Sequence, residues 1–296
     1  QLNIQGELVG KTFTVNGKTI EAKVPPTNTA KLKEEFNKLT QQLPIGANAP
    51  FTITIGGRTF DVSKRIGRGE ASSVYEAVEQ GATAKIALSI PRVETDTMTD
   101  ESLQERFVFQ ERSQLFAALM ASTDQTYPYR ETLRYGESGI PVTISAIGTL
   151  IDQNAYIGNA KGVKGVVVDL LSDITRMESV GIYGHFDIKP TNALIVGSRL
   201  RIIDFELSRA TSALETELDG LGLYFNELGC GSPAFGSPRQ LVDINDANVQ
   251  DDLFSIMEFA HRLYFGSGKY HISIPNTDTY IDEVQNSPQE IALHKN

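Results

Sequence analysis

The stretch GIYGHFDIKPTNALIV, residues 181–196, restricts the fold and chemistry of this 296-residue chain more than any other segment. It places His185, Asp187, Lys189 and Asn192 within eight positions, between two apolar flanks. The proline inside the stretch keeps the residue before it out of the helical conformation, so the polar side chains can converge instead of spiralling apart. We therefore predict that an acid, a base and an amide act together at this loop.

The flanking segments place this loop between buried elements. Residues 162–181 read as a long buried helix with a glycine stop at Gly181, and two short strands follow over 192–196 and 199–205. Asp204 ends the second apolar strand, where an aspartate is usually only a turn or cap residue. Together with Asp187 and Asn192 of the loop, however, Asp204 supplies two carboxylates and an amide, and these groups suit a hard divalent cation such as Mg²⁺.

The rest of the chain changes from strand-rich to helix-rich, which predicts an α+β fold of two lobes. Alternating residues around Asn16-Gly17 predict a hairpin, and Thr27 or Asn28 could cap a helix over 27–43. Further along the chain we expect a helix from Glu101 to Met120 and a long loop with short helical turns over 210–238. A last helix over 251–266 is apolar nearly all round, so we expect it to be buried.

Composition limits the compartment and the classes of partner. The net charge of −10, from 27 basic and 37 acidic residues, argues against wide contact with nucleic acid or an anionic membrane surface. Cys230 is the single cysteine, so no intramolecular disulfide can form, which fits a reducing compartment. No apolar run approaches the about 18 residues of a transmembrane helix, and the start lacks the basic and apolar regions of a signal peptide. We therefore expect a cytoplasmic protein without a membrane span.

A glycine turn lies in the segment RIGRGEASSVYEAVE. Gly67 and Gly69 let the backbone approach a ligand closely, and Ile66 and Val74 could sandwich a flat ring. A plain hairpin turn is the alternative reading, because Ser72 stands where a nucleotide-binding glycine motif has its third glycine. The next residues read as a strand, so we predict a hairpin lid and not the helix of a dinucleotide-binding fold.

Lys85 lies in the apolar strand segment GATAKIALSI, where a lysine is rare without a partner. One reading is an edge lysine whose charge reaches solvent, and the other is a phosphate anchor held by an acid. In the following predicted helix, Glu111 falls inside the apolar stripe, whereas Glu105 has more polar neighbours. Because a carboxylate on a core-facing stripe needs a cation, we pair Lys85 with Glu111 and keep Glu105 as the second choice.

The order of these motifs resembles that of the protein kinase superfamily. A glycine turn, a lysine strand, a glutamate helix, the HFDIKPTN loop and an Asp-Phe pair follow one another between about Phe60 and Phe265. The Lys-Pro of the loop is similar to that found in the serine/threonine branch of the family. The segment GSPAFGSPRQL resembles the end of an activation segment, and Asp252 stands in the place of the family's structural aspartate. The resemblance implies an α+β, bilobal kinase-like fold. A β-rich N-terminal extension would cover 1–59 and a kinase-like domain 60–296. This domain would divide into an N-lobe of about 60–147 and a shortened helical C-lobe of about 148–296.

The resemblance also implies two cofactors, ATP and Mg²⁺, and a role for each motif residue. Asp187 would orient the substrate hydroxyl and accept its proton, while Lys189 would neutralise the γ-phosphate. Asn192 and Asp204 would hold Mg²⁺, and His185 is expected to be a packed core residue. Lys85 would contact the α- and β-phosphates of ATP, and Glu111 would align it. Leu194 would lie below the adenine. The other implied nucleotide contacts belong to the glycine-turn hairpin: Ile66, Gly67, Gly69, Ser72 and Val74.

Three positions and the short C-terminal part depart from the family pattern. Phe186 replaces the arginine that usually pairs with a phosphorylated activation loop, so we predict activity without phosphorylation of that loop. Glu206 replaces the glycine of Asp-Phe-Gly, and Arg239 replaces the glutamate of Ala-Pro-Glu, whose ion pair must then be lost, inverted or replaced. Only 31 residues follow Phe265, which implies a trimmed C-lobe similar to that of some bacterial effector kinases and, for such an effector, a host cytoplasm.

These observations predict an ATP- and Mg²⁺-dependent serine/threonine protein kinase with a protein substrate, and they leave the need for an activating partner protein open. A pseudokinase acting as a binding module is the first alternative; the retention of Lys85, Asp187, Asn192 and Asp204 speaks against it. A small-molecule kinase or nucleotidyl transferase is the second; aminoglycoside kinases usually lack the Lys-Pro and the GSPxF segment. For residues 1–59 the simplest expectation is an extra packed sheet that extends the small lobe.

Overall fold

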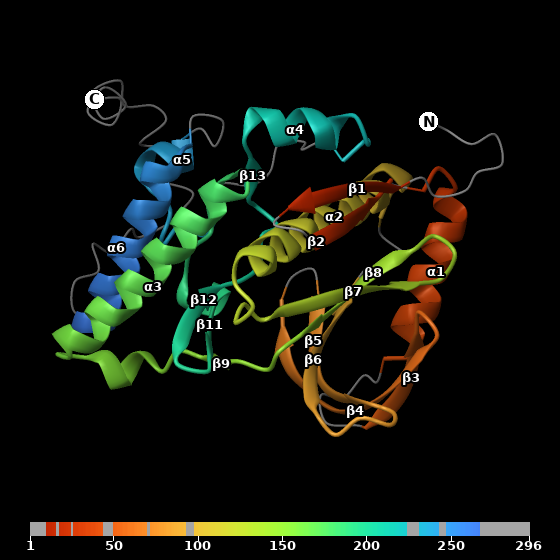
Figure 1. Cartoon of the computed structure of the whole chain (residues 1–296), viewed down its shortest axis with the longest axis horizontal. Helices are drawn as coiled ribbons and strands as arrows, with labels where there is room; N and C mark the ends of the chain where they lie inside the picture. The colour runs from red at the N-terminus through yellow and green to blue at the C-terminus, as the bar shows by residue number, and fades with distance from the viewer. Residues whose placement is uncertain are drawn as a thin grey trace. The chain divides into compact units, whose positions relative to one another are not determined.

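The computed structural model describes residues 10–15, 18–24, 26–43, 50–69, 72–92, 98–223, 231–242 and 247–266, whose helices and strands are drawn in Figure 1. The chain forms two compact units. Unit 1 comprises Gln1–Ile147 and Glu215–Asn226, and unit 2 comprises Gly148–Leu214 and Glu227–Asn296. In the part of the chain that the structure describes, no helix is both long and apolar enough to cross a membrane.

Unit 1 is built on a six-stranded antiparallel sheet with the strand order β3-β4-β5-β6-β8-β7. A separate hairpin of β1 and β2 lies along α2 (Figure 1). The strands of unit 1 are β1 Gly10–Val15, β2 Lys18–Lys23, β3 Phe51–Ile55, β4 Arg58–Arg68, β5 Ser72–Glu79, β6 Lys85–Pro91, β7 Tyr129–Tyr135 and β8 Ile140–Ser145. Its two long helices are α1 Thr29–Gln41 and α2 Asp100–Thr123.

Capping residues explain where both helices of unit 1 begin. The side chain of Asn28 accepts the N–H of Lys31 at 3.0 Å and so caps α1, while Thr99 caps α2 in the same way. Glu35 of α1 is buried and accepts the N–H groups of Glu137 and Ser138, both at 2.8 Å, in the turn between β7 and β8. One hydrophobic core joins the helices to the sheet through buried residues that include Leu32, Phe36, Phe60, Tyr75, Leu88, Phe107 and Val142.

Unit 2 contains two packed helices, α3 Ala160–Ser179 and α6 Val249–Phe265, which lie side by side (Figure 1). A three-stranded sheet has the order β12-β11-β9, and β10 pairs with β13. The strands are β9 Thr149–Leu150, β10 Ile182–Gly184, β11 Ala193–Val196, β12 Arg199–Ile202 and β13 Arg209–Ala210. The shorter helices are α4 Ser212–Asp219, which begins in unit 2 and ends in unit 1, α5 Pro238–Val242, and the 3₁₀ turns Gln153–Tyr156 and Pro190–Asn192.

A buried aspartate ties α3 to the small sheet of unit 2. Asp173 is fully buried and accepts hydrogen bonds from Arg176 at 2.7 Å, from Arg201 at 2.9 Å and from the N–H of Ile202 at 3.0 Å. Burial raises the pKa of Asp173, while these donors lower it. The network therefore ties α3 to the strand that leads to Asp204.

The structure confirms the predicted hairpin, in which Val15 pairs with Lys18, and the helices predicted over 27–43 and from Glu101 to Met120. The helix before the HFDIKPTN loop is also confirmed, and Gly181 follows it with a φ of 83°. This helix is buried on one face only, because Val168 and Leu171 are exposed. Two further expectations need correction. The stretch 210–238 contains an eight-residue α-helix, α4, and α6 is not buried all round, because Leu253, Phe254 and Met257 are exposed and α3 packs on another of its faces.

Candidate active site

A buried carboxylate fixes the backbone of the HFDIKPTN loop. Asp252 lies in the first turn of α6, is fully buried, and accepts the N–H groups of His185 and Phe186, both at 2.7 Å. Phe186 has a φ of 61°, which residues other than glycine rarely adopt, and Gln240 Nε2 donates to its carbonyl at 2.5 Å. Burial raises the pKa of Asp252 to about 7, whereas the two N–H donors lower it. These bonds hold the loop in a conformation that it would not adopt alone.

His185 is a packed residue, as predicted. Its side chain is fully buried, with its ring 5.2 Å from the ring of Phe205. The N–H of Asp187 donates to Nδ1 at 3.3 Å, so the ring proton belongs on Nε2, which faces the carbonyl of Ile203 at 3.1 Å. Burial lowers the pKa of His185 to about 4, although the charge of Asp187 raises it. The imidazole is therefore neutral near pH 7 and serves to support the loop.

The structure brings Asp187, Lys189 and Asn192 together around one carboxylate. Asp187 Oδ2 accepts Lys189 Nζ at 2.7 Å and Asn192 Nδ2 at 2.8 Å. Lys189 is extended before Pro190, and the N–H of Asn192 closes the following 3₁₀ turn onto the carbonyl of Lys189 at 2.9 Å. The proline thus has the local effect that the sequence predicted, and the three side chains point to the same place.

Ser232 is a member of this cluster that the sequence analysis did not single out. Its N–H donates to Asp187 Oδ1 at 3.0 Å, and its hydroxyl receives Lys189 Nζ at 2.6 Å. The preceding Gly231 has a φ of 76°, and a Cβ there would lie 2.4 Å from the carbonyl oxygen of Phe186. The signal in the sequence was the Gly-Ser-Pro of the segment resembling the end of an activation segment, but which partner it meets depends on tertiary structure.

Asp204 and Asn192 have the chemistry of a site for a hard cation. Asn192 uses its amide nitrogen for both hydrogen bonds to Asp187, which leaves the amide oxygen for another ligand. Asp204 has a φ of 69° and a side chain that reaches solvent. The surrounding protein and the charge of Asp187 raise its pKa, and Lys189 lowers it. Since a cation would relieve this repulsion, an amide oxygen and a carboxylate fit Mg²⁺. Within the described ranges no three His, Cys, Asp or Glu side chains gather as a metal site, so other ligands would have to complete the shell.

Arg239 forms an ion pair with Asp251 at the start of α6. Its guanidinium donates to Asp251 Oδ2 at 2.7 Å and to Asn248 Oδ1 at 3.0 Å. Asp251 is buried and also accepts the hydroxyl of Ser237. This ion pair attaches the segment around α5 to the start of α6.

The glycine turn is a hairpin between β4 and β5. Gly67 pairs with Val74, and the N–H of Gly69 donates to the carbonyl of Ser72 at 2.9 Å. Ile66 is exposed beside the turn. The residues after the turn form a strand, so the predicted hairpin is confirmed and a dinucleotide-binding helix is absent at this place.

The predicted pair of Lys85 and Glu111 is not formed within unit 1. Lys85 Nζ lies 2.8 Å from Glu76 Oε1, and its side chain is 63% exposed. Lys85 pairs with Val78 at one end of β6, whereas the other end pairs with Ser72 next to the glycine turn. The six residue steps from Lys85 to Pro91 span about 20 Å, which places Lys85 far from the turn. The expectation was wrong because the strand register, and not the apolar setting, decides where this lysine lies.

Glu111 has a different cation, Arg134 of β7. The guanidinium donates to both carboxylate oxygens, at 2.5 Å and 2.7 Å, and the N–H of Lys23 donates to Oε1 at 2.7 Å. Glu111 is 2% exposed, so the prediction that it needs a cation is confirmed, with another residue as its partner. Glu105, the second choice, is half-buried on the same helix. Arg134 could not be identified as the partner of Glu111 from the sequence, because only the packing of α2 on β7 brings the two residues together.

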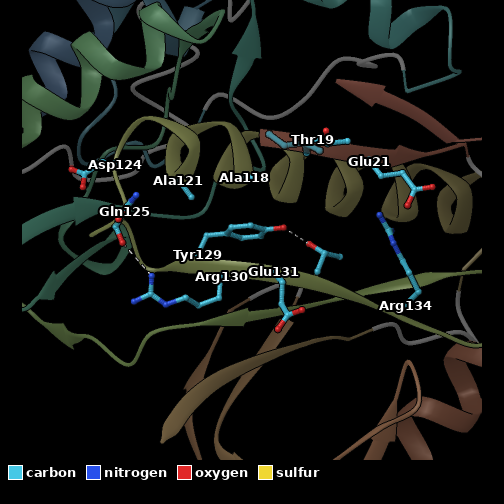
Figure 2. A pocket seen from close by; sticks show the side chains of 12 residues that line it. Thr19, Glu21, Ala118, Ala121, Asp124, Gln125, Tyr129, Arg130, Glu131 and Arg134 are labelled. Carbon is cyan, nitrogen blue, oxygen red and sulfur yellow. Dashed lines mark hydrogen bonds between the residues drawn. The ribbon is translucent and has the colours of Figure 1, made fainter. Parts of the chain in front are cut away.

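A cavity of about 480 Å³ lies in unit 1 between β2, α2 and β7 (Figure 2). Tyr129 crosses it, with its hydroxyl 2.9 Å from that of Thr132, and Arg130 donates to the carbonyl of Gln125 at 3.3 Å. Arg134 also lines the cavity. None of the residues predicted to bind nucleotide or metal is among those that line it.

Comparison with known proteins identifies related sequences and folds. The family model described as "Protein kinase domain" matches residues 60–290. The chain is 28% identical over 172 residues to the dual specificity protein kinase Ttk of Danio rerio, covering 56% of this chain and 16% of that protein. It is 24% identical over 238 residues to the serine/threonine-protein kinase MPS1 of Encephalitozoon cuniculi, covering 79% and 37%.

A third relative is bacterial. The serine/threonine-protein kinase AfsK of Streptomyces coelicolor is 23% identical over 204 residues, covering 67% of this chain and 23% of that protein. The chain thus spans well under half the length of these relatives. A solved crystal structure of a kinase domain matches with a TM-score of 0.55 at 13% identity, covering 74% of this chain and 67% of that one. This likeness supports the α+β kinase-like fold.

We predict that Arg134→Met destabilises the chain, because it leaves the buried carboxylate of Glu111 without its cation. Removal of one partner of a buried ion pair typically costs about 3–5 kcal/mol in the free energy of unfolding. Lys85→Met, the matched control, removes an exposed ion pair and should leave stability unchanged within error. Urea-induced unfolding of the intact chain measures both variants. A larger loss in Lys85→Met than in Arg134→Met would contradict the pairing described here.

Proposed function

Since the chain belongs to the protein kinase domain family, we propose that it transfers the γ-phosphoryl group of ATP to serine or threonine hydroxyls of proteins, with Mg²⁺ as cofactor. The observation that carries this proposal is the cluster around Asp187, whose carboxylate is held by Lys189, Asn192 and Ser232. Phosphoryl transfer needs positioned groups and charge compensation more than covalent participation of the protein, and this cluster supplies both.

In the proposed reaction, Asp187 accepts the proton of the substrate hydroxyl while the hydroxyl oxygen forms its bond to the γ-phosphorus. The bond from the γ-phosphorus to the bridging oxygen breaks, and ADP leaves. Lys189, whose ammonium lies 2.7 Å from Asp187 Oδ2, compensates negative charge on the transferring group. The hydrogen bonds of Asp187 fix its orientation before the substrate binds, which lowers the cost of ordering the site.

The proposed cofactor contacts follow from the residues that fit them. Asn192 and Asp204 would hold Mg²⁺, which supplies charge neutralisation to the phosphates when it is bound. Ile66, Gly67, Gly69, Ser72 and Val74 of the hairpin, together with Leu194 of β11, are proposed to contact ATP. We do not extend the role of phosphate anchor to Lys85, because it is exposed and lies at the end of β6 that is remote from the glycine turn.

One observation favours a pseudokinase as the second candidate. Neither Lys85 nor Glu111 is available to the other, since each has a different partner. The intact cluster of Asp187, Lys189 and Asn192 supports an active enzyme. A pseudokinase would bind partners without producing phosphorylated protein, so the two functions differ in a measurable product.

We further propose that activity does not require phosphorylation of the activation segment. Phe186 stands before the catalytic aspartate and is 1% exposed, so no arginine is present there to receive a phosphate. The loop is instead held by Asp252 and Gln240. These contacts support a loop that is already in place in the unmodified chain.

Replacing Asp187 tests the proposed reaction. Asp187→Asn should lower the rate of transfer from γ-labelled ATP to a generic protein substrate by about 10²–10⁴-fold, because an amide cannot accept the proton. The exposed Asp61→Asn, which changes the same charge on β4, serves as the control and should transfer at the wild-type rate. A wild-type chain that binds ATP but labels no protein would contradict the proposal and support the pseudokinase.

Alanine substitutions in the activation segment test the second proposal. Arg209→Ala, Thr211→Ala and Ser212→Ala should each retain kcat within about twofold of wild type, because none of them removes a required phosphate acceptor or its partner. Pretreatment of the wild-type chain with a phosphatase should also leave kcat unchanged. A collapse of activity in the phosphatase-treated chain, with recovery after incubation with ATP, would show that phosphorylation is needed.

A further inference from the structure

We propose that the ion pair of Arg112 and Glu215 holds the activation segment in the orientation used for phosphoryl transfer, so that a carboxylate of the chain takes the place of an added phosphate. This inference rests on the proposed function and gives a cause for its independence from phosphorylation. Arg112 belongs to α2 and Glu215 to α4, and both lie in unit 1.

The geometry of this pair is specific. Arg112 Nη1 donates to Glu215 Oε1 at 2.7 Å, and Nη2 donates to Oε2 at 3.0 Å. Nη1 also donates to the carbonyl of Leu223 at 2.8 Å, and the guanidinium lies 5.4 Å from the centre of the Phe116 ring. Two parallel bonds between a guanidinium and a carboxylate fix both distance and angle, which a single ammonium could not do.

Burial makes the pair more than a surface contact. Arg112 is 1% exposed and Glu215 is 26% exposed. A guanidinium removed from water requires a counter-ion, so α2 depends on the segment that supplies Glu215. The same segment buries Leu218 and Leu223 completely. The ion pair, the carbonyl of Leu223 and two buried apolar side chains thus all help to hold residues 215–223.

The anchored residues belong to a segment with functional groups at both ends. It begins after Asp204, a proposed Mg²⁺ ligand, and leads to Ser232, which contacts Asp187 and Lys189. A phosphate on such a segment typically pairs with an arginine and so orders the segment. Glu215 supplies the negative charge, and Arg112 supplies the cation from α2. Phe186 cannot supply a cation to this segment, and Arg112 supplies one instead.

The expected consequence is a loss of kcat without a loss of nucleotide binding. Glu215→Gln keeps the shape but removes the charge, and it should lower kcat about tenfold or more while the Kd for ATP stays within about twofold. Glu215→Asp keeps the charge and should recover part of the rate. Asp219→Asn is the matched control, because it removes an exposed carboxylate from the same helix, and it should have the wild-type rate.

Two further measurements separate orientation from stability. Hydrogen exchange of residues 212–223 should become faster in Glu215→Gln than in wild type, independently of any activity. The double variant Arg112→Met with Glu215→Leu replaces the buried ion pair by apolar side chains, which usually preserves the fold. It should melt near the wild-type temperature yet show the reduced kcat.

The outcomes distinguish this inference from the function on which it rests. A wild-type chain that transfers no phosphate overturns the proposed function and this inference with it. An active wild type with an equally active Glu215→Gln overturns the inference alone, as does a double variant with full kcat. A Glu215→Gln variant that is faster than wild type would mean that the pair restrains the segment instead of preparing it.

Discussion

Asp252 lies fully buried at the start of α6, and its two carboxylate oxygens accept the backbone N–H groups of His185 and Phe186. These donors would otherwise be buried without acceptors, and Phe186 would lose a contact that compensates its positive φ. The position of Asp187, the next residue, follows from this constraint. Its contacts with Lys189, Asn192 and Ser232 then need little further ordering, and this preorganisation is what phosphoryl transfer requires of a protein.

The two units use their charged residues differently. In unit 2, Asp187 is partly exposed and Asp204 is exposed, while pairs such as Arg239 with Asp251 hold the surrounding segments. In unit 1, neighbouring residues of α2 form ion pairs, Glu111 with Arg134 and Arg112 with Glu215. Buried ion pairs of this kind contribute orientation more than net stability, since desolvation offsets much of their attraction.

The sequence predicted those features that depend on local chemistry. The side chains of the HFDIKPTN loop converge because Pro190 keeps the backbone of Lys189 extended. Helix α1 begins after Asn28 because the side chain of Asn28 caps it. Features that depend on register or on distant neighbours were predicted poorly. Lys85 was placed beside Glu111 although strand pairing puts it beside Glu76, and Arg134 was missed because only the packing of β7 on α2 brings it close. The exposed face of α6 was missed because apolar residues around a helix do not show which neighbours cover it.

The chemical identity of the product tests the central claim most directly. The purified chain would be incubated with Mg²⁺, ATP labelled at the γ-phosphate and a protein substrate, and the labelled product would be separated and hydrolysed to its amino acids. The account predicts phosphoserine or phosphothreonine. Label recovered only on a small molecule, or transfer of AMP to protein when the α-phosphate carries the label, would contradict it.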